Sequence, residues 1–439
     1  MTLRFTRCSS FLRTSGRATI GRCGLVLLAF GLMAAGQAQE WTRFRGPNGS
    51  GLSDAKTVPT KWTVADFNWR VALPGVGHSS PVVWGEKVFI TSCDEKAGKF
   101  YVLCLNADDG GIRWQKEYPL TPHAKHNLNS LASSTPTVDA DHVYVCRTES
   151  ARVTLFALTH DGKLVWEKDL GPFAANHGSG TSPMLHEGMV VFANEHSGES
   201  FLIAVDAKTG DTRWKRPRTS DGGSYSTPCV YQPEQGGSQL IFNSEGHGIS
   251  GLAPDTGKVI WEFEKAFDKR SVSSPYVAGE LIIGSCGSGG GGNYVVAVRP
   301  GDPARGIKPQ RAYEVRRSAP YVPTSICVGD WLYLWSDGGI VSRVNAITGE
   351  VKWQERVGGN FYGSPVCVDG RLFCASTTGE MVVVAVSDKF EVLARNPLGE
   401  LAHSTPAVSG GRMYIHTSGH LVSIGGKTTP GTRPQAGGS

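Results

Sequence analysis

Side chains capable of binding ligands recur at one place in a repeated pattern of this sequence. They lie shortly before steps in which serine or threonine leads into proline, such as HSSP ending at Pro81 and HSTP ending at Pro406. Imidazole and phenol groups donate and accept hydrogen bonds, and a guanidinium can hold a carboxylate or phosphate with two parallel bonds. The candidate ligand-binding residues are His78, His126, Asn127, Asn129, His177, Arg218, Tyr225, Arg270, Tyr362 and His403, with Tyr321 in the same place before a degenerate step.

The sequence supports metal binding and catalysis at these positions less than it supports ligand binding. His78, His177 and His403 stand at similar offsets in the repeat, which would permit a metal ion, but the spacing between repeats argues against simultaneous ligation. The serines and threonines have a structural alternative, in which their hydroxyls bond to the backbone where the chain turns into a strand. In that alternative the histidines are solvated loop residues. We therefore predict no metal site and assign no catalytic residue.

Signatures of other active sites are missing from the sequence. It contains no HExxH, no phosphate-binding Walker loop, no GxSxG and no CxxCH for haem attachment. The glycine-rich stretch at residues 284–292 runs between two predicted strands, so no helix N-terminus is available there to hold phosphate. We interpret it as a loop between strands.

A repeat of four short strands positions the candidate residues. Eight copies of the Ser/Thr-Pro step occur, one of them degenerate (residues 322–325), spaced by roughly 40 to 55 residues. Each copy continues as two strands joined by a tight turn, a third strand such as residues 201–207, and a fourth strand after a Gly-containing turn. This period predicts an all-β, eight-bladed β-propeller of four-stranded antiparallel blades. The fourth strands carry tryptophans expected to pack between blades, namely Trp69, Trp114, Trp166, Trp214, Trp261 and Trp353.

Ring closure is predicted from the two ends of the repeat. The eighth copy ends near Ile424, one strand short, whereas residues 67–73 match a fourth strand ahead of the first copy. An N-terminal strand would complete the last blade and leave no open edge. In such a ring the residues before each step converge on the mouth of one central channel, the usual pattern of a ligand site.

The ends of the chain predict export. Five arginines precede an apolar run at residues 25–35 and a small-residue site, which is the order of a signal peptide cleaved after Ala38. We divide the chain into a signal peptide (1–38), an N-terminal extension outside the ring (39–66), the propeller (67–425) and a disordered tail (426–439). Without the first segment acidic and basic residues balance, so we expect no nucleic-acid partner. We expect a protein that is soluble after cleavage and monomeric.

Eight cysteines follow the signal segment, mostly in apolar strand-like runs and without CxxC spacing. We interpret them as buried thiols, although disulfides are permitted in an exported protein.

The turn and tryptophan pattern DxxTGxxxW, most complete at residues 206–214, resembles the PQQ-like repeat family. That family includes quinoprotein dehydrogenases and BamB-like propellers, and the resemblance covers residues 67–425. The opening WxxFRGPxGxG at residues 41–51 is similar to that of exported members of the same family.

The resemblance implies two functions that the sequence weighs differently. Alcohol-oxidising relatives hold PQQ over calcium beside a vicinal disulfide, and this chain has no adjacent cysteines. We predict no cofactor and favour a non-catalytic binding or scaffolding module for a protein, peptide or other component of the cell envelope, periplasmic or secreted. Cys23 precedes the apolar run, so a lipid anchor like that of BamB is not expected. The alternative is a PQQ- and calcium-dependent dehydrogenase, or another enzyme, that uses the channel mouth.

Overall fold

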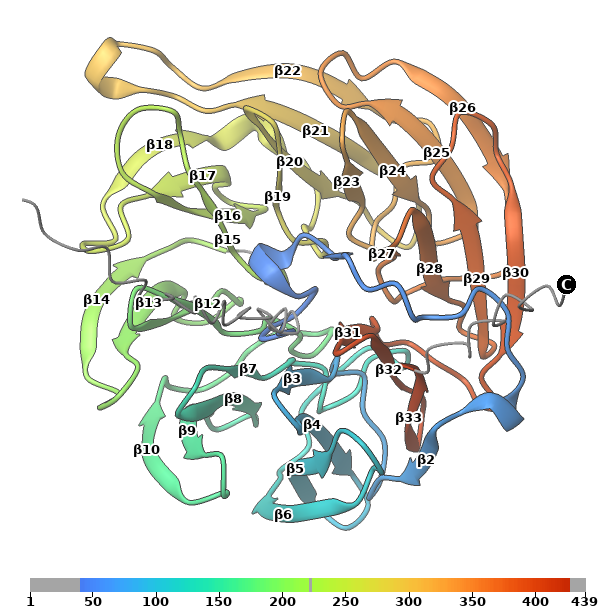
Figure 1. Cartoon of the computed structure of the whole chain (residues 1–439). Coiled ribbons are helices and arrows are strands. Elements are labelled where there is room, and N and C mark those ends of the chain that lie inside the picture. Colours follow the sequence, from blue (N-terminus) through green and yellow to red (C-terminus); the bar gives the residue numbers. More distant parts are fainter. Residues whose placement is uncertain (1–39, 221–222, 427–439) are drawn as a thin grey trace, which may run out of the picture. The chain divides into compact units, whose positions relative to one another are not determined.

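The computed structural model describes residues 40–220 and 223–426, so the signal peptide and most of the predicted tail lie outside the described residues. Eight sheets form a ring of blades around a central axis (Figure 1). Seven of the sheets have four strands and one has five. The prediction of an all-β, eight-bladed propeller is confirmed.

The blades follow one another along the chain, and each starts at the axis. Blade 1 has β3 (Val82–Trp84), β4 (Lys87–Asp94), β5 (Lys99–Asn106) and β6 (Ile112–Pro119). Blade 2 has β7 (Thr137–Val138), β8 (His142–Thr148), β9 (Val153–Thr159) and β10 (Leu164–Asp169). Blade 3 has β11 (Met184–His186), β12 (Met189–Asn194), β13 (Phe201–Asp206) and β14 (Thr212–Pro217). Blade 4 has β15 (Cys229–Tyr231), β16 (Gln239–Ser244), β17 (Gly248–Leu252) and β18 (Val259–Phe263).

The second half of the ring repeats this order. Blade 5 has β19 (Tyr276–Ala278), β20 (Leu281–Cys286), β21 (Tyr294–Arg299) and β22 (Gln310–Val315). Blade 6 has β23 (Ile326–Val328), β24 (Trp331–Trp335), β25 (Ile340–Asn345) and β26 (Val351–Arg356). Blade 7 has β27 (Val366–Val368), β28 (Arg371–Ala375), β29 (Glu380–Ala385) and β30 (Val392–Pro397). Blade 8 has β31 (Ala407–Ser409), β32 (Arg412–His416) and β33 (His420–Gly425).

Burial explains the sequence pattern of each strand. The middle strands pack between neighbouring blades on both faces, so β12 and β16 are buried along their whole length. The outermost strands alternate instead, and in β14 only Trp214 is buried among exposed and half-exposed residues. Continuous apolar runs therefore mark the inside of a blade and alternating runs mark its rim.

An N-terminal strand closes the ring, as predicted. Strand β2 (Trp69–Ala72) pairs antiparallel with β33, with Trp69 opposite Ser423 and Ala72 opposite His420. Blade 8 thus has four strands, three from the end of the propeller sequence and one from its beginning.

The tryptophans of the outer strands bind the following blade. Trp166 of blade 2 donates its indole N–H to the carbonyl of Ala207 in blade 3 at 2.9 Å. Its ring lies against Gly210 of the same turn, where a Cβ atom would stand 2.7 Å from the indole. Only glycine permits this approach, since any side chain would clash. Trp69, Trp114, Trp214 and Trp353 donate to the next blade in the same way.

Three blades depart from this pattern. Trp261 donates to Gln239 of its own blade at 2.7 Å. Between blades 5 and 6 a tyrosine replaces tryptophan, and the Tyr313 hydroxyl donates to the carbonyl of Ala346 at 2.7 Å. The outer strand β30 of blade 7 carries no tryptophan. The six predicted tryptophans therefore lie in six of the eight blades, and Trp261 has a different geometry from the other five.

The segment before β2 does not lie outside the ring, which corrects the sequence interpretation. Residues 41–52, here called the plug, cross the axis over the inner strands (Figure 1, blue). Trp41 bridges to Val83 of blade 1, Asn48 exchanges two hydrogen bonds with Val230 of blade 4, and β1 (Leu52–Ser53) pairs in parallel with β27. Because these contacts go to several blades, the plug ties the centre of the ring together.

Two arginines of the plug are fully buried. Arg45 donates to the carbonyl of Ser325 at 2.9 Å, and Arg43 donates to Met184 and Pro228. Burial lowers the pKa of each guanidinium to about 10. Neither forms an ion pair within residues 40–220 and 223–426. The Nε atom of Arg43 and the Nε and Nη1 atoms of Arg45 are buried without a hydrogen-bond partner among the described residues.

Short 3-10 turns are the only helical elements in the described part of the chain: η1 (Pro47–Gly49), η2 (Val64–Asp66), η3 (Glu264–Ala266) and η4 (Pro303–Arg305). None of the described helices is long and apolar enough to cross a membrane. The cysteines there are free thiols, all of them buried except the half-buried Cys327.

Candidate functional site: a cavity on the ring axis

A cavity of about 540 Å³ occupies the centre of the ring. Residues that precede the inner strands of all eight blades line it, and Phe44 of the plug contributes the lining at the axis. The repeat explains this arrangement, since each Ser/Thr-Pro step turns the chain into its innermost strand. The cavity is large enough for a small ligand held by many side chains.

The structure brings most of the candidate residues together at this cavity. Those that line it are His78, His126, Asn129, His177, Tyr225, Arg270, Tyr362 and His403, together with Tyr321. Asn127 is exposed and lies outside the lining, and Arg218 is buried elsewhere. Ligand binding by this set stays a prediction.

A ring of hydroxyl groups forms part of the wall. At six of the eight blade boundaries, the backbone N–H of a step residue donates to the hydroxyl of the step residue in the following blade. The bonded pairs, each with a donor–acceptor distance of 2.8 to 3.0 Å, are Ser80 to Thr135, Thr135 to Ser182, Thr227 to Ser274, Ser274 to Thr324, Thr324 to Ser364, and Ser364 to Thr405. The structural alternative from the sequence had these hydroxyls bonding to the backbone, and here that backbone belongs to the neighbouring blade.

These hydroxyls retain a donor that faces the cavity. Each accepts one N–H, and none of the six donates to an acceptor in the described part of the chain. All six line the cavity. Because a hydroxyl can donate one hydrogen bond as well as accept two, the wall offers a circle of O–H donors to a ligand or to water.

Three of the histidines at the cavity, His78, His177 and His403, have lowered pKa values. His78 Nε2 lies 3.2 Å from His403 Nδ1, and the rings of His126 and His177 stack with centroids 5.9 Å apart. Burial, with His403, His416 and Lys125 nearby, lowers the pKa of His78 to about 3. Burial also lowers the pKa of His403, and burial followed by Arg270 and His126 lowers that of His177. These imidazoles therefore act as neutral donors and acceptors.

One cation and one acid line the cavity. Arg270 donates to the Tyr321 hydroxyl at 3.2 Å and forms no ion pair within the described residues. The two carboxylate oxygens of Asp337 accept the backbone N–H groups of Tyr321 and Val322 at 2.7 and 3.0 Å. Burial raises the pKa of Asp337. Asp337 thus braces the loop that carries Tyr321, whereas Arg270 remains available to a ligand.

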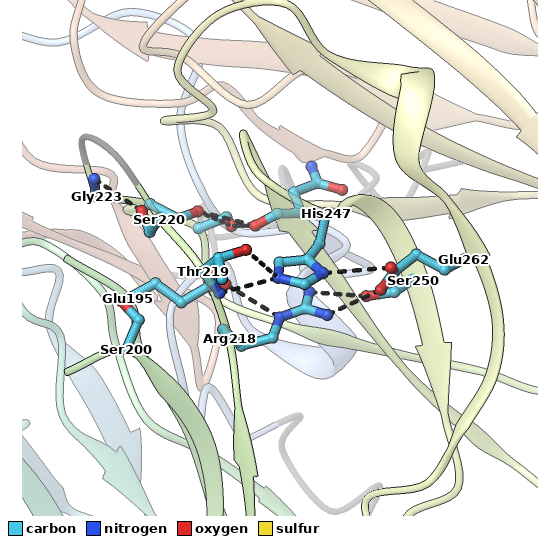
Figure 2. A network of polar contacts seen from close by, with 12 residues as sticks. Glu195, Ser200, Arg218, Thr219, Ser220, Gly223, His247, Ser250 and Glu262 are labelled. Atoms are coloured by element: carbon cyan, nitrogen blue, oxygen red, sulfur yellow. Dashed lines mark hydrogen bonds and ion pairs between the residues drawn. The ribbon is translucent and has the colours of Figure 1, made fainter. Parts of the chain in front are cut away.

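Arg218 has a structural role that the sequence could not reveal. Its guanidinium donates to Glu195 at 3.2 Å, to Glu262 at 3.0 Å and to Ser250 at 3.0 Å (Figure 2). His247 contacts the second oxygen of Glu262 at 3.2 Å. The side chains of Arg218 and Glu195 are 1% and 0% exposed, so this ion pair is sealed within blades 3 and 4. Arg218 is therefore buried among these partners and outside the lining of the cavity.

PQQ with calcium does not fit these residues. Calcium takes six to eight oxygen ligands, commonly from several carboxylates. Asp337 is the sole carboxylate among the lining residues, and its oxygens are used by the backbone. Across residues 40–220 and 223–426 no group of three or more His, Cys, Asp or Glu side chains could hold a metal ion. We therefore assign no chemical step to this cofactor.

Several residues that line the cavity were not predicted from the sequence. Phe44 comes from the plug, and Asp337 and Asn293 come from loops between the second and third strands of blades 6 and 5. The glycine-rich loop, predicted to join two strands, does so and also lines the cavity through Ser288, Gly289 and Gly291. The Ser/Thr-Pro steps mark one set of loops only, so residues from the other loops carry no repeated signal.

Comparison with known proteins gives one family match and several structural likenesses. The model of the family described as outer membrane protein assembly factor BamB matches residues 98–301 and 317–429. A polyvinylalcohol dehydrogenase from Pseudomonas sp. is 24% identical over 259 residues, which cover 48% of this chain and 39% of that protein. BamB from Yersinia pestis is 25% identical over 205 residues, which cover 44% of this chain and 47% of that protein. Each alignment thus spans less than half of the relative's length.

Solved structures share the fold at low identity. BamB from Moraxella catarrhalis superposes with a TM-score of 0.55 at 15% identity, over 81% of this chain and 97% of that one. A europium-containing methanol dehydrogenase gives 0.63 at 11% identity, over 86% and 89% of the two chains. The quinohemoprotein alcohol dehydrogenase of Comamonas testosteroni gives 0.59 at 12% identity, over 89% and 81%. An outer membrane protein assembly factor and dehydrogenases are both built on this scaffold, so fold alone does not decide between their functions.

Proposed function

The chain belongs to the family described as outer membrane protein assembly factor BamB, and from this premise we propose that it is a non-catalytic binding module of the cell envelope. Its ligand would be a component of the envelope that enters the axial cavity. The observation that carries this proposal is the composition of the cavity wall. Hydroxyls, neutral imidazoles and tyrosines surround a space of about 540 Å³, with one unpaired cation and no cluster of carboxylates.

A dehydrogenase remains the competing function because oxidoreductases share the fold. The donor set described above argues against it, since a redox cofactor over calcium needs several oxygen ligands. Export to the envelope rests on the signal peptide predicted at residues 1–38, and is supported by the name of the family.

Binding and catalysis can be separated by thermal melting of the purified protein with and without PQQ and calcium, with dye reduction by alcohols measured in the same samples. A ligand that binds only the folded state raises the melting midpoint. We expect no shift and no dye reduction at saturating cofactor. A rise in the midpoint together with alcohol-dependent dye reduction would show that the protein is a quinoprotein dehydrogenase.

A matched pair of variants tests whether the cavity is the binding site. Gly289 lines the cavity and Gly237 lies in an exposed loop, and an added Cβ atom would meet nothing within 4 Å at either position. Gly289→Trp should therefore fill the cavity without disturbing the fold, and Gly237→Trp is its control. Immobilised wild type and Gly237→Trp should retain an envelope component that Gly289→Trp does not. Equal retention by all three proteins would contradict binding in the cavity.

A further inference from the structure

Arg270 is a cation without a partner at the wall of a concave site. Its Nη1 atom donates to Tyr321, its Nε atom is buried without a hydrogen-bond partner, and no carboxylate within residues 40–220 and 223–426 pairs with it. Guanidinium groups at the edge of a cavity are stabilised by an anionic partner, most often a carboxylate or phosphate held by two bonds. An anion supplied by a ligand would complete this arrangement.

The other charged groups near the cavity do not provide that anion. Asp337 is the lining acid, and both of its oxygens already accept backbone N–H groups from the loop at Tyr321 and Val322. Arg270 and Asp337 form no ion pair with each other within the described residues, and Arg270 contacts the Tyr321 hydroxyl instead. Lys269, its neighbour in the chain, donates to the carbonyl of Gly291 at 2.8 Å.

The remainder of the wall favours a ligand rich in hydrogen-bond acceptors. Six step hydroxyls present unpaired O–H donors around the axis, just before the inner strands of six different blades. An apolar or weakly polar ligand would leave these donors without partners, which costs binding free energy. A polyhydroxylated molecule could satisfy several at once, because each of its hydroxyl oxygens both accepts and donates.

Aromatic rings complete the wall. Tyr225, Tyr321 and Tyr362 precede the inner strands of blades 4, 6 and 7, on either side of Arg270 in the order of the ring. The neutral pair His78 and His403 precedes blades 1 and 8 and so lies across the cavity from Arg270. A ligand with one charged end and one uncharged polar end would match these two sides.

We propose that the cavity binds a sugar acid, with its carboxylate at Arg270 and its hydroxyls along the ring of step hydroxyls. This inference rests on the proposed function, because it names the chemical class of the ligand that the cavity takes. A uronic acid combines the features that the wall requires, namely one carboxylate, several hydroxyl oxygens and a ring with an apolar face. A peptide carboxyl terminus would match Arg270 but would leave most of the hydroxyl donors unused.

Isothermal titration of the full-length protein with D-galacturonate and with tri-galacturonate tests the proposal. D-galactose is the uncharged analogue, acetate is the carboxylate alone, and N-acetyl-trialanine is the peptide carboxylate. We expect galacturonate to bind at least ten times more tightly than galactose, and acetate to bind weakly or not at all. Gly289→Trp should abolish binding of galacturonate.

Variants of Arg270 separate the carboxylate contact from the rest of the site. Arg270→Gln should weaken galacturonate binding about tenfold or more, to the level of galactose, and leave galactose unchanged. Arg270→Lys should recover part of the loss because it keeps the charge without the planar pair of donors. Arg317, which is exposed and outside the cavity lining, provides the control variant Arg317→Gln, which should bind like wild type.

The other outcomes overturn one or both proposals. Galactose binding as tightly as galacturonate, or binding of galacturonate that Arg270→Gln does not alter, overturns the carboxylate assignment. Binding of the tripeptide without binding of any sugar replaces the ligand class. If no probe binds while capture of an envelope component still depends on Gly289, the sugar-acid inference fails and the proposed function stands. If that capture is also missing, both fail.

Discussion

The Nε2 atom of His78 lies 3.2 Å from the Nδ1 atom of His403, across the boundary between blade 1 and blade 8. A third histidine lies beside this pair, because His416 Nδ1 contacts the carbonyl of Ser79 at 2.8 Å. Burial lowers the pKa of His78 to about 3 and that of His416 to about 4. The closing boundary of the ring is therefore built from neutral imidazoles that resist protonation.

This cluster predicts that acid destabilises the protein. A histidine with a lowered pKa in the folded state contributes its full stability above its unfolded pKa of about 6.5, and that contribution is lost as the pH falls toward the folded value. We expect each of His78 and His416 to remove about 2 kcal/mol between pH 7.5 and pH 5. Urea unfolding at the two pH values measures the loss. His416→Asn should reduce it, and an unchanged pH dependence in that variant would exclude His416 as a source.

The hydrogen bond of Trp166 predicts how much one contact between blades contributes to the free energy of unfolding. Trp166→Phe removes the indole donor and leaves the carbonyl of Ala207 without its 2.9 Å partner. We expect a loss of about 1–3 kcal/mol in the free energy of unfolding, the usual cost of an unsatisfied buried group. Trp84→Phe is the control, because the half-exposed Trp84 indole bonds to no group in the described part of the chain. Equal losses in the two variants would mean that ring size, not the hydrogen bond, matters.

We predict that the backbone conformation of Gly46 is needed to keep the plug in place. Its φ and ψ of 64° and −150° fall in a region open essentially to glycine alone, and a Cβ atom would stand 2.6 Å from the Trp41 ring. Gly46→Ala should lower stability by about 1–3 kcal/mol from backbone strain, with added loss as Trp41 is displaced. Hydrogen exchange across residues 41–52 should rise more than elsewhere. Gly237→Ala, in an exposed loop, should change neither quantity, and a protected plug in Gly46→Ala would refute this role.

We expect the buried ion pair of Arg218 and Glu195 to contribute more to stability than an ion pair at the surface. Arg218→Met leaves the Glu195 carboxylate buried without its partner, and we expect a loss of about 3–5 kcal/mol. Arg213→Met breaks an exposed pair with Asp206 and should cost under about 1 kcal/mol. Adding Glu195→Gln to Arg218→Met should restore part of the stability, since the neutral amide needs no counter-charge. A double variant as unstable as Arg218→Met alone would argue that packing explains the loss.

The fold could be predicted because its determinants recur. The Ser/Thr-Pro steps repeat once per blade and the tryptophans of the outer strands recur in six of the eight blades, and each marks a fixed place in the blade. Strand β2 was predictable for the same reason, because Trp69 repeats the fourth-strand pattern before the first step. Tyr313 was missed because a longer turn through η4 precedes it, so the tryptophan pattern is interrupted there.

The plug and part of the site could not be predicted because their contacts do not recur. The plug contacts several blades through different residues, such as Asn48 with Val230 and Arg43 with Met184, and its sequence has no period to compare. Phe44 and Asp337 reach the cavity from segments that no repeat marks. Arg218 matched the expected offset, yet its partners Glu195 and Glu262 stand 23 and 44 residues away in the chain. Pairing at that distance depends on how blades 3 and 4 pack.

The pairing of β2 with β33 also affects the order in which the blades can be completed during synthesis. Strand β2 is synthesised before blade 1, whereas its partner β33 follows blade 7 in the chain. Until the two strands pair, a nascent chain presents unpaired strand edges that can join those of other chains. Closure of the ring therefore comes after the other seven blades have been made, and it removes the last of these edges.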